Sequence, residues 1–388
     1  MLGLRGSSPG SKNIISAEMH VVFLLPSPAE GPTGGYKVVM EHAARMVAEG
    51  YRVTVCYAGS IFYRQKPLKF KLSGIVRYLQ KYFRGFSYGR WMAINPKIKE
   101  RLTFSLNYCH VPHGADRYIA TSPYTAWYLD RYPVDADRKF YFIQGKEDWG
   151  SGLRAILDDT YHMALNKITI ASWLRDMLRF QYAEDSALVC NGFDFGYFKM
   201  SVPAQKRNHP VVSMLWHDMA LKDCRMGWEA LKIVKKEVPD LQVKMFGTPE
   251  RPDFLPEWVE YTRRPSRDEH NEIYNSSQVF MATSRSEGWG LTVGEAMICG
   301  AAVACTDCGG FREMATDGVT ALISPVGDAE AMASNVIKLL KDDRLRISIA
   351  QQAAENIHRF TWENSHAAMM EALGLPTVTT STQNCDNR

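Results

Sequence analysis

Two acidic residues flank a glycine-rich loop in the second half of the chain. Glu287 and Glu295 lie on either side of Gly-Trp-Gly in the segment SRSEGWGLTVGEAM, which begins at Ser284. The apolar stretch before it, QVFMATS, predicts a strand ending at the carboxyl edge of a parallel sheet, where open α/β sheets bind ligands. Glycines let a ligand approach the backbone closely, and the start of the following helix favours an anion. The segment therefore predicts a phosphate or diphosphate site.

The two acids suit hydroxyl groups better than phosphates. Glu295 lies about one turn into the predicted helix, where it can accept hydrogen bonds from a ribose 2′/3′ pair. Glu287 precedes the loop, on the side where the hydroxyls of a sugar would lie. We therefore interpret the segment as a nucleotide-sugar site. The alternative is two surface acids favoured by a helix dipole, and it leaves the paired glycines unexplained.

Both halves of the sequence contain repeated β-α units, which would place the ends of their strands at one edge of a sheet. The first half opens with a predicted β-α-β unit, HVVFLL, YKVVMEHAARMVAEG and YRVTVCYA, and the second half restarts the pattern at PVVSMLW. Repeated β-α units imply parallel sheets with right-handed crossovers. The sequence thus predicts two doubly wound α/β domains, joined near residues 188–199. The region from Ser60 to Arg101 breaks this alternation.

Composition and cysteine usage narrow the class of protein. The chain has 388 residues, 46% hydrophobic and 23% charged, which predicts a globular protein of two domains. No run of eighteen apolar residues and no secretory signal are present, so we expect a cytoplasmic location with reduced cysteines. Cys305 and Cys308 form a C-x-x-C without a second ligand pair, which favours a strand end over a zinc or redox site.

A basic, aromatic segment at residues 64–101 stands out because the net charge of the whole chain is only +4. Within PLKFKLSGIVRYLQKYFRGF, apolar residues share one helical face and basic residues fall on its borders. Three interpretations stay open: a helix on an anionic membrane surface, a helix packed on the domain core, and a site for an anionic glycan. The basic residues are Arg64, Lys66, Lys69, Lys71, Arg77, Lys81, Arg84, Arg90, Lys97, Lys99 and Arg101.

The spacing of Glu287 and Glu295 matches the E-x7-E motif, and the chain resembles the retaining glycosyltransferases of family four, which have the GT-B fold. The resemblance extends over SRSEGWGLTVGEAMICGAAVACTDCGGFREMATDGVTALISPVGD, the segment NGFDFGYF, the loop TGGYKVV and the turn TWENS. It implies two Rossmann-like domains that face each other across a cleft. It also implies transfer of a sugar from a nucleotide donor to an acceptor hydroxyl, with retention of configuration and without a metal.

The resemblance implies a role for each matching residue. Glu295 would bind the donor ribose, and Glu287 would contact the donor sugar. Lys222 would neutralise the diphosphate, so Lys222 and Glu287 are the predicted catalytic residues. The remaining predicted donor-binding residues are Gly34, Gly35, Gln144, His217, Gly288, Trp289, Gly290, Leu291 and Thr292, those from Gly288 to Thr292 acting through their backbone.

Two positions depart from the family pattern. His217 stands where the family usually has an arginine, and imidazole is charged only below its pKa near 6.5. Gln144 stands where many members have a histidine. With Glu147 nearby, Gln144 resembles the bacterial rhamnan and polysaccharide branch. We expect leaving-group stabilisation that is weaker or dependent on pH.

These inferences give a domain plan and a set of partners. We expect a flexible leader (1–18), an N-terminal acceptor-binding domain (19–190), a C-terminal nucleotide-sugar-binding domain (191–360), a helix returning to the first domain (361–375) and a flexible tail (376–388). The expected partners are a nucleotide sugar and a glycan or lipid-linked acceptor of cell-surface polysaccharide synthesis. We expect no nucleic acid, cofactor or metal, and peripheral attachment to the inner face of the membrane if the basic segment binds lipid.

Two other classes of protein are alternatives to a glycosyltransferase. A nicotinamide dehydrogenase is set aside, because the loop PSPAEGPTGG lacks G-x-G-x-x-G and the second strand ends without an acid. A non-catalytic GT-B relative that binds nucleotide sugars or glycans stays open because of His217. The histidines His110 and His113 have no matching ligand cluster, so they predict no metal site.

Overall fold

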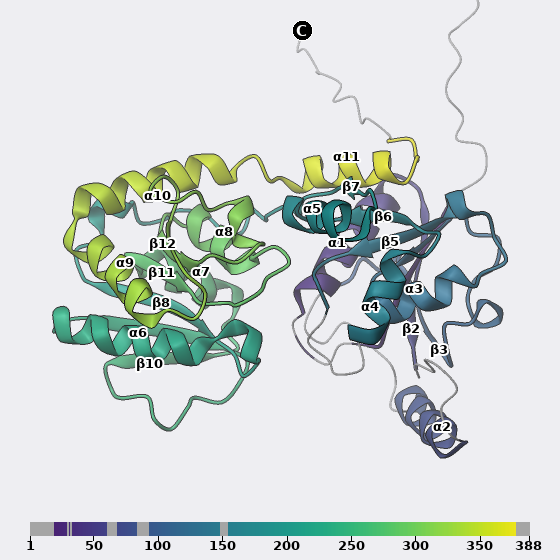
Figure 1. The fold of residues 1–388 in the computed structure, drawn as a ribbon, viewed down its shortest axis with the longest axis horizontal. Coiled ribbons are helices and arrows are strands. Elements are labelled where there is room, and N and C mark those ends of the chain that lie inside the picture. Colours follow the sequence, from purple (N-terminus) through teal and green to yellow (C-terminus); the bar gives the residue numbers. More distant parts are fainter. Residues whose placement is uncertain are drawn as a thin grey trace, which may run out of the picture.

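The structure, a computed structural model, describes residues 19–28, 31, 33–59, 68–83, 93–147 and 154–377. The expected leader 1–18, most of the expected tail and parts of the basic segment (60–67 and 84–92) lie outside these ranges. The described chain folds into two lobes, each built around its own parallel sheet (Figure 1). The prediction of two doubly wound α/β domains is confirmed.

The first lobe has a seven-stranded sheet in the order β3-β2-β1-β4-β5-β6-β7. Its strands are β1 (His20–Leu25), β2 (Arg52–Ala58), β3 (Lys99–Thr103), β4 (Arg117–Ala120), β5 (Lys139–Ile143), β6 (Asn166–Thr169) and β7 (Ala187–Leu188). Its helices are α1 (Gly34–Ala48), α2 (Leu68–Phe83), α3 (Pro123–Asp130), α4 (Arg154–Tyr161) and α5 (Ser172–Tyr182).

The second lobe has a six-stranded sheet in the order β10-β9-β8-β11-β12-β13. Its strands are β8 (Val211–Trp216), β9 (Gln242–Gly247), β10 (Val259–Arg263), β11 (Val279–Ala282), β12 (Ala302–Thr306) and β13 (Leu322–Ser324). Its helices are α6 (Cys224–Glu237), α7 (Arg267–Ser276), α8 (Leu291–Ile298), α9 (Ala329–Lys341) and α10 (Asp343–Ile357), with the short 3-10 helices η5 (Ala220–Lys222) and η6 (Phe311–Glu313). The last helix, α11 (Trp362–Ala372), packs against α1 of the first lobe.

The strands of both sheets follow the burial pattern expected for parallel sheets covered on both faces. Every residue of β1, β5, β11 and β12 is buried, which explains why these strands are continuous apolar runs in the sequence. Three strands, β3, β7 and β10, were not predicted, and each lies at the edge of its sheet. An edge strand pairs on one side only, so its residues are more polar and the apolar signal is weak.

The region around α2 corrects one expectation. The segment from Ser60 to Arg101 was expected to break the β-α alternation, but its described part continues it as β2-α2-β3, with β3 paired parallel to β2. The helix α2 projects away from the rest of the first lobe in Figure 1. The helical spacing of apolar residues in PLKFKLSGIVRYLQKYFRGF predicted α2, whereas the strand β3 that follows it was not predicted.

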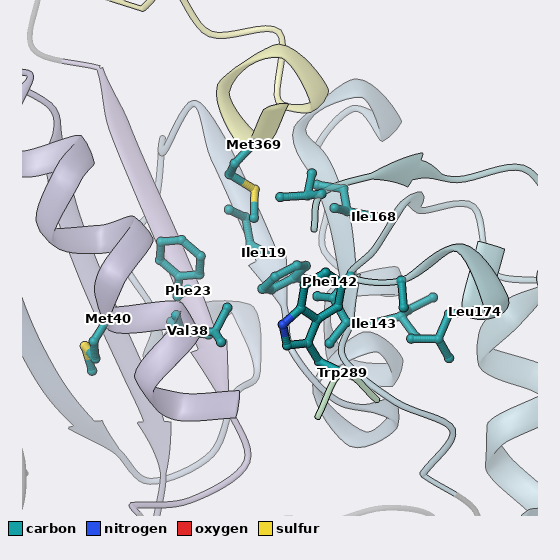
Figure 2. Packing of buried hydrophobic residues seen from close by; sticks show 14 of the residues in the cluster. Phe23, Val38, Met40, Ile119, Phe142, Ile143, Ile168, Leu174, Trp289 and Met369 are labelled. Carbon is teal, nitrogen blue, oxygen red and sulfur yellow. The ribbon is translucent and has the colours of Figure 1, made fainter. Parts of the chain in front are cut away.

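The two lobes share part of their hydrophobic core. Phe193 N donates to Phe360 O at 3.0 Å, so the two chain segments that connect the lobes run side by side. Trp289 of the second lobe is 3% exposed and belongs to the same buried cluster as Phe142 and Ile143 of the first lobe (Figure 2). This shared core holds the loop before α8 close to the end of β5.

Candidate active site

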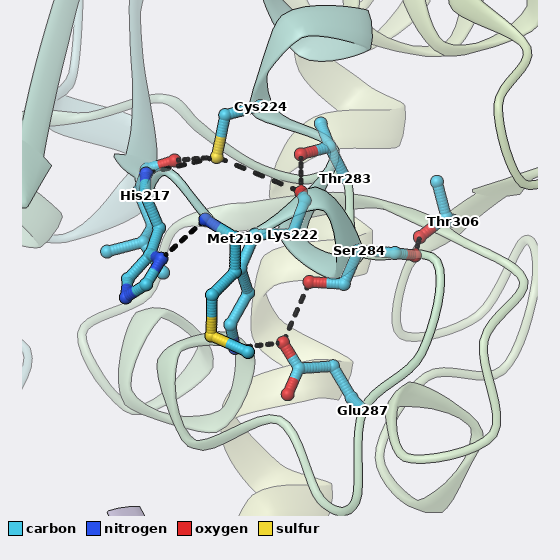
Figure 3. Close-up of polar contacts among 9 residues, drawn as sticks. His217, Met219, Lys222, Cys224, Thr283, Ser284, Glu287 and Thr306 are labelled. Carbon is cyan, nitrogen blue, oxygen red and sulfur yellow. Dashed lines mark hydrogen bonds and ion pairs between the residues drawn. The ribbon is translucent and has the colours of Figure 1, made fainter. Parts of the chain in front are cut away.

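The centre of the candidate site is an ion pair between the two predicted catalytic residues (Figure 3). Lys222 Nζ donates to Glu287 Oε1 at 2.6 Å, and Ser284 Oγ donates to the same oxygen at 2.7 Å. Both charged side chains stay partly exposed, 25% for Lys222 and 15% for Glu287. With Thr292 and Phe311 they line one small pocket. The ammonium group is therefore held at one place while remaining open to a ligand.

The loop that follows β11 holds Lys222 in place. Thr283 Oγ1 donates to Lys222 O at 2.8 Å, and Arg285 N donates to Leu221 O at 2.7 Å. The side chain of Arg285 also pairs with Asp223, Nε to Oδ2 at 2.7 Å. Helix η5, which ends at Lys222, is thus tied to the loop that follows β11. This arrangement preorganises the cation instead of leaving it on a free surface.

His217 lies at the end of β8 beside the same pocket. Burial and the nearby Lys222 lower the pKa of His217 below 6.5, so the imidazole is neutral at pH 7. Met219 N donates to His217 Nδ1 at 3.0 Å, which places the ring proton on Nε2. His217 can therefore donate one hydrogen bond but supplies no permanent charge.

The loop from Gly288 to Gly290 requires its glycines. Gly290 has φ +99, in the left-handed region, and a Cβ there would lie 2.6 Å from the ring of Phe311. Gly290 is the N-cap of α8, so the N–H groups of Leu291 and Thr292 have no acceptor within the helix. Such a helix start binds anions. The Gly288 loop and this helix end lie next to the Lys222 ammonium group.

The first lobe contacts this loop directly. A Cβ on Gly288 would lie 1.9 Å from Gln144 O, and a Cβ on Gly35 would lie 3.2 Å from Gln144 Oε1. A Cβ on Gly34 would lie 3.3 Å from Leu291 Cδ1. The structure therefore brings together five predicted donor-binding residues from both lobes. Only glycine permits this approach of two backbones.

Trp289 contributes differently from its neighbours. Its indole packs edge-on against Phe360, with ring centroids 5.0 Å apart, and lies 6.4 Å from the ring of Phe193. The side chain is buried. Trp289 can therefore offer a ligand only its backbone, and its ring anchors the glycine loop.

Glu295 lies one turn inside α8 and is buried, 7% exposed. Tyr274 Oη donates to Glu295 Oε2 at 3.3 Å. Burial raises the pKa of Glu295 to about 7, while Lys37 of α1 and the hydrogen bond from Tyr274 oppose this rise. Lys37 belongs to the first lobe, so both lobes act on this carboxyl group.

Other ionisable groups near the lobe boundary have shifted pKa values. Burial raises the pKa of Glu147, in the loop after β5, to about 8. Burial also raises the pKa of Cys308 to about 12, and Cys305 is buried as well, so these thiols are protonated at pH 7. Within the described ranges, no group of three or more His, Cys, Asp or Glu side chains is placed to hold a metal.

The geometry adds residues that the sequence pattern did not identify. Ser284, Lys37 and Tyr274 contact or act on the predicted acids, and Trp173 Nε1 donates to Gly288 O at 3.1 Å. Ser284 precedes Glu287 by three residues, so its contact was accessible to sequence reasoning. Lys37, Tyr274 and Trp173 belong to segments that are distant in the sequence. The local spacing of residues therefore could not show that they lie near this site.

Solved structures with the same architecture identify the class of fold. Sucrose-phosphate synthase from Thermosynechococcus elongatus superimposes with a TM-score of 0.69 at 15% identity, covering 91% of this chain and 98% of the other. Anabaena HepE, solved with UDP and glucose, superimposes with a TM-score of 0.67 at 15% identity, covering 92% and 99%. The two lobes form a GT-B fold.

Parts of the chain also have sequence relatives. The family Glycosyl transferases group 1 matches residues 211–342, within the second lobe. Phosphatidyl-myo-inositol mannosyltransferase of Mycolicibacterium smegmatis is 38% identical over 84 residues, 22% of each chain. D-inositol 3-phosphate glycosyltransferase of Corynebacterium urealyticum is 27% identical over 185 residues, 43% of this chain and 44% of the other. Residues 211–342 of the second lobe are thus similar to Glycosyl transferases group 1, and the whole chain has the GT-B fold that its sequence resemblance predicted. The matches span less than half the length of these two relatives, and the rhamnan branch stays a prediction.

In the part of the chain that the structure describes, no helix is long and apolar enough to cross a bilayer.

Proposed function

We propose that the protein is a retaining glycosyltransferase that moves a hexose or deoxyhexose from a nucleoside-diphosphate sugar to an acceptor hydroxyl. The observation that carries the proposal is the Lys222–Glu287 pair, 2.6 Å apart, beside the partly buried start of α8. A cation and a helix N-terminus at one point suit a diphosphate. Glu295, one turn further along α8, suits a ribose diol.

The proposed chemistry needs only groups of this chain and its two substrates. The bond between the anomeric carbon and the diphosphate oxygen breaks, and the acceptor oxygen bonds to the anomeric carbon on the same face. The acceptor proton passes to the departing diphosphate. Lys222, the Nε2–H of His217 and the amides at the start of α8 stabilise the negative charge on the diphosphate as it departs, without a metal.

Two similar proteins support the identity of the substrates. Anabaena HepE was solved with UDP and glucose, and a relative 26% identical over 118 residues is named O-antigen chain mannosyltransferase B of Escherichia coli. These likenesses favour a nucleoside-diphosphate hexose donor and a glycan or lipid-linked acceptor of cell-surface polysaccharide. We place the acceptor on the first lobe, because the predicted diphosphate and ribose contacts lie on the second.

A binding screen followed by product analysis tests the proposed function. We expect calorimetry with UDP-glucose, GDP-mannose and dTDP-rhamnose to give saturable binding of at least one of them. NMR of the product of transfer, or of slow hydrolysis, should show the same anomeric configuration as the donor. Activity should persist in EDTA. Binding without any turnover would favour the alternative, a non-catalytic GT-B protein that binds nucleotide sugars or glycans. No binding of any nucleotide sugar would contradict both.

The exposed face of α2 favours an additional membrane contact. Tyr78 packs inward, with its ring 5.5 Å from that of Phe104. Five apolar residues of α2 instead face outward at the helical spacing i, i+1, i+4, i+7 and i+8, so this face does not pack on the core. The exposed fractions are Ile75 40%, Val76 52%, Leu79 41%, Tyr82 61% and Phe83 79%. The sequence places Lys69, Lys71, Arg77 and Lys81 on the same helix. We propose that α2 lies on the inner, anionic leaflet and brings the enzyme to a lipid-linked acceptor.

Liposome flotation tests this contact. We expect the wild-type protein to float with phosphatidylglycerol-containing vesicles at low salt and to dissociate as salt rises, because each basic residue near such a surface contributes about 1 kcal/mol. A variant in which Lys69, Lys71, Arg77 and Lys81 become Glu should not float. The matched control also reverses four charges, by changing Lys232 and Lys236 on α6 and Lys338 and Lys341 on α9, all exposed, to Glu, and it should still float. A wild-type protein that stays unbound at low salt would exclude the membrane contact and favour a soluble or anionic glycan acceptor.

A further inference from the structure

The first turn of α5, in the first lobe, is capped by a carboxylate from the second lobe. Helix α5 begins at Ser172 without a capping side chain of its own and without an acid in its first turn. Glu313 Oε1, at the end of η6, accepts hydrogen bonds from Ser172 N at 2.6 Å, Ser172 Oγ at 2.5 Å and Trp173 N at 3.3 Å. A helix N-terminus favours a negative charge. The cap that α5 lacks is thus supplied only when the two lobes are in contact.

The same helix end makes a second contact with the opposite lobe. Trp173 Nε1 donates to Gly288 O at 3.1 Å. The indole also lies flat against Gly309, where a Cβ would come within 2.5 Å of Trp173 Cδ2. Gly309 must therefore be glycine for the lobes to meet in this way.

These contacts reach the backbone of the candidate active site. Gly310 N donates to Glu287 O at 3.1 Å, and a Cβ on Gly310 would lie 2.7 Å from Trp289 N. The Gly309–Gly310 turn therefore supports the loop from Glu287 to Trp289. Trp173 contacts the same loop at Gly288.

We propose that Glu313 and Trp173 form an interlobe latch that positions the Glu287–Gly290 loop for the donor. Both are positioning residues, because they reach the candidate substrate site only through the backbone of that loop. The donor-positioning part of this inference rests on the proposed glycosyltransferase function, whereas the latch itself does not. When the latch opens, the loop loses the contact that Trp173 makes with it from the first lobe, and the apparent donor affinity falls with the fraction of closed molecules.

Hydrogen exchange tests the latch without any substrate. In Glu313→Ala, the amides of residues 172–173 lose their acceptor, and we expect them to exchange about ten-fold faster. The amides of the 287–291 loop should also exchange faster, because the loop is released. In Glu313→Gln, one oxygen can still accept all three hydrogen bonds, so both segments should stay near wild type. The matched control is Glu330→Gln, an exposed acid on α9. Exchange in the 287–291 loop that does not change in Glu313→Ala would overturn the latch.

Donor binding tests the positioning role. Using the nucleotide sugar that the wild type binds among UDP-glucose, GDP-mannose and dTDP-rhamnose, we expect Glu313→Ala and Trp173→Phe to raise Kd about ten-fold. Trp173→Phe removes the indole N–H and one of the two rings, while keeping one aromatic ring next to Gly309. Glu313→Gln should stay within about three-fold. Faster loop exchange with an unchanged Kd would overturn the positioning role. If the wild type binds no nucleotide sugar, the proposed function fails and the exchange data alone decide the latch.

Discussion

Replacing Lys222 with alanine is expected to lower kcat about 100- to 1000-fold, the usual cost of losing one preorganised group that stabilises charge in the transition state. The physical reason is specific to this site. The Lys222 ammonium lies 2.6 Å from Glu287 and beside the start of α8, where negative charge on the diphosphate would develop. Its removal also leaves the Glu287 carboxylate without its cation. The measurement is steady-state transfer or hydrolysis of the donor identified by the binding screen.

A matched lysine controls for general effects of the substitution. Lys232 on α6 is exposed and pairs with Glu229 at 2.6 Å, so Lys232→Ala removes an ion pair of the same length outside the site. Exposed pairs contribute little to stability, and we expect this variant to keep wild-type kcat and melting temperature. Full activity of Lys222→Ala would disprove the assignment of Lys222 to the leaving group.

Replacing Glu295 with glutamine is expected to raise the donor KM about 10- to 100-fold, with kcat changed much less. A hydrogen bond to a charged group is worth about 1.5–3 kcal/mol, and about 1.4 kcal/mol corresponds to a factor of ten. The pKa of Glu295 is raised to about 7, so the group is protonated below pH 7 and ionised above it. Since the carboxylate is the better acceptor for a ribose diol, kcat/KM of the wild type should fall as the pH drops below about 7.

In Glu295→Gln this fall of kcat/KM at low pH should be absent, because the amide of glutamine does not titrate. The contribution of Glu295 to stability depends on pH in the opposite direction to kcat/KM. The native pKa lies above the ordinary value of 4.5, so the contribution of Glu295 to stability is present below pH 4.5 and is lost as the pH rises through 7. Glu295→Gln should therefore melt no lower than wild type at pH 8. An unchanged KM, or a fall of kcat/KM below pH 7 that persists in the variant, would contradict the assignment of Glu295 to the ribose. Glu330→Gln serves as the control.

Local patterns in the sequence determined the fold and the core of the site. Continuous apolar runs mark the buried parallel strands such as β1 and β12, because both faces of these strands are covered. The E-x7-E spacing identified Glu287 and Glu295, because one loop and one helical turn fix their separation. The strands β3, β7 and β10 were not predicted. Each lies at the edge of its sheet and pairs on one side only, so its sequence is more polar.

The tertiary structure decided everything that depends on how distant segments meet. The outward direction of the apolar face of α2 was open from the sequence, because the same amphipathic pattern serves a core-facing and a ligand-facing helix. The raised pKa of Glu295 comes from its burial, and the spacing of residues in the sequence does not predict that burial. The capping of α5 by Glu313 joins residues that are 141 positions apart. Such contacts exist only after the two lobes have folded and docked, because their geometry depends on the relative position of two separate sheets.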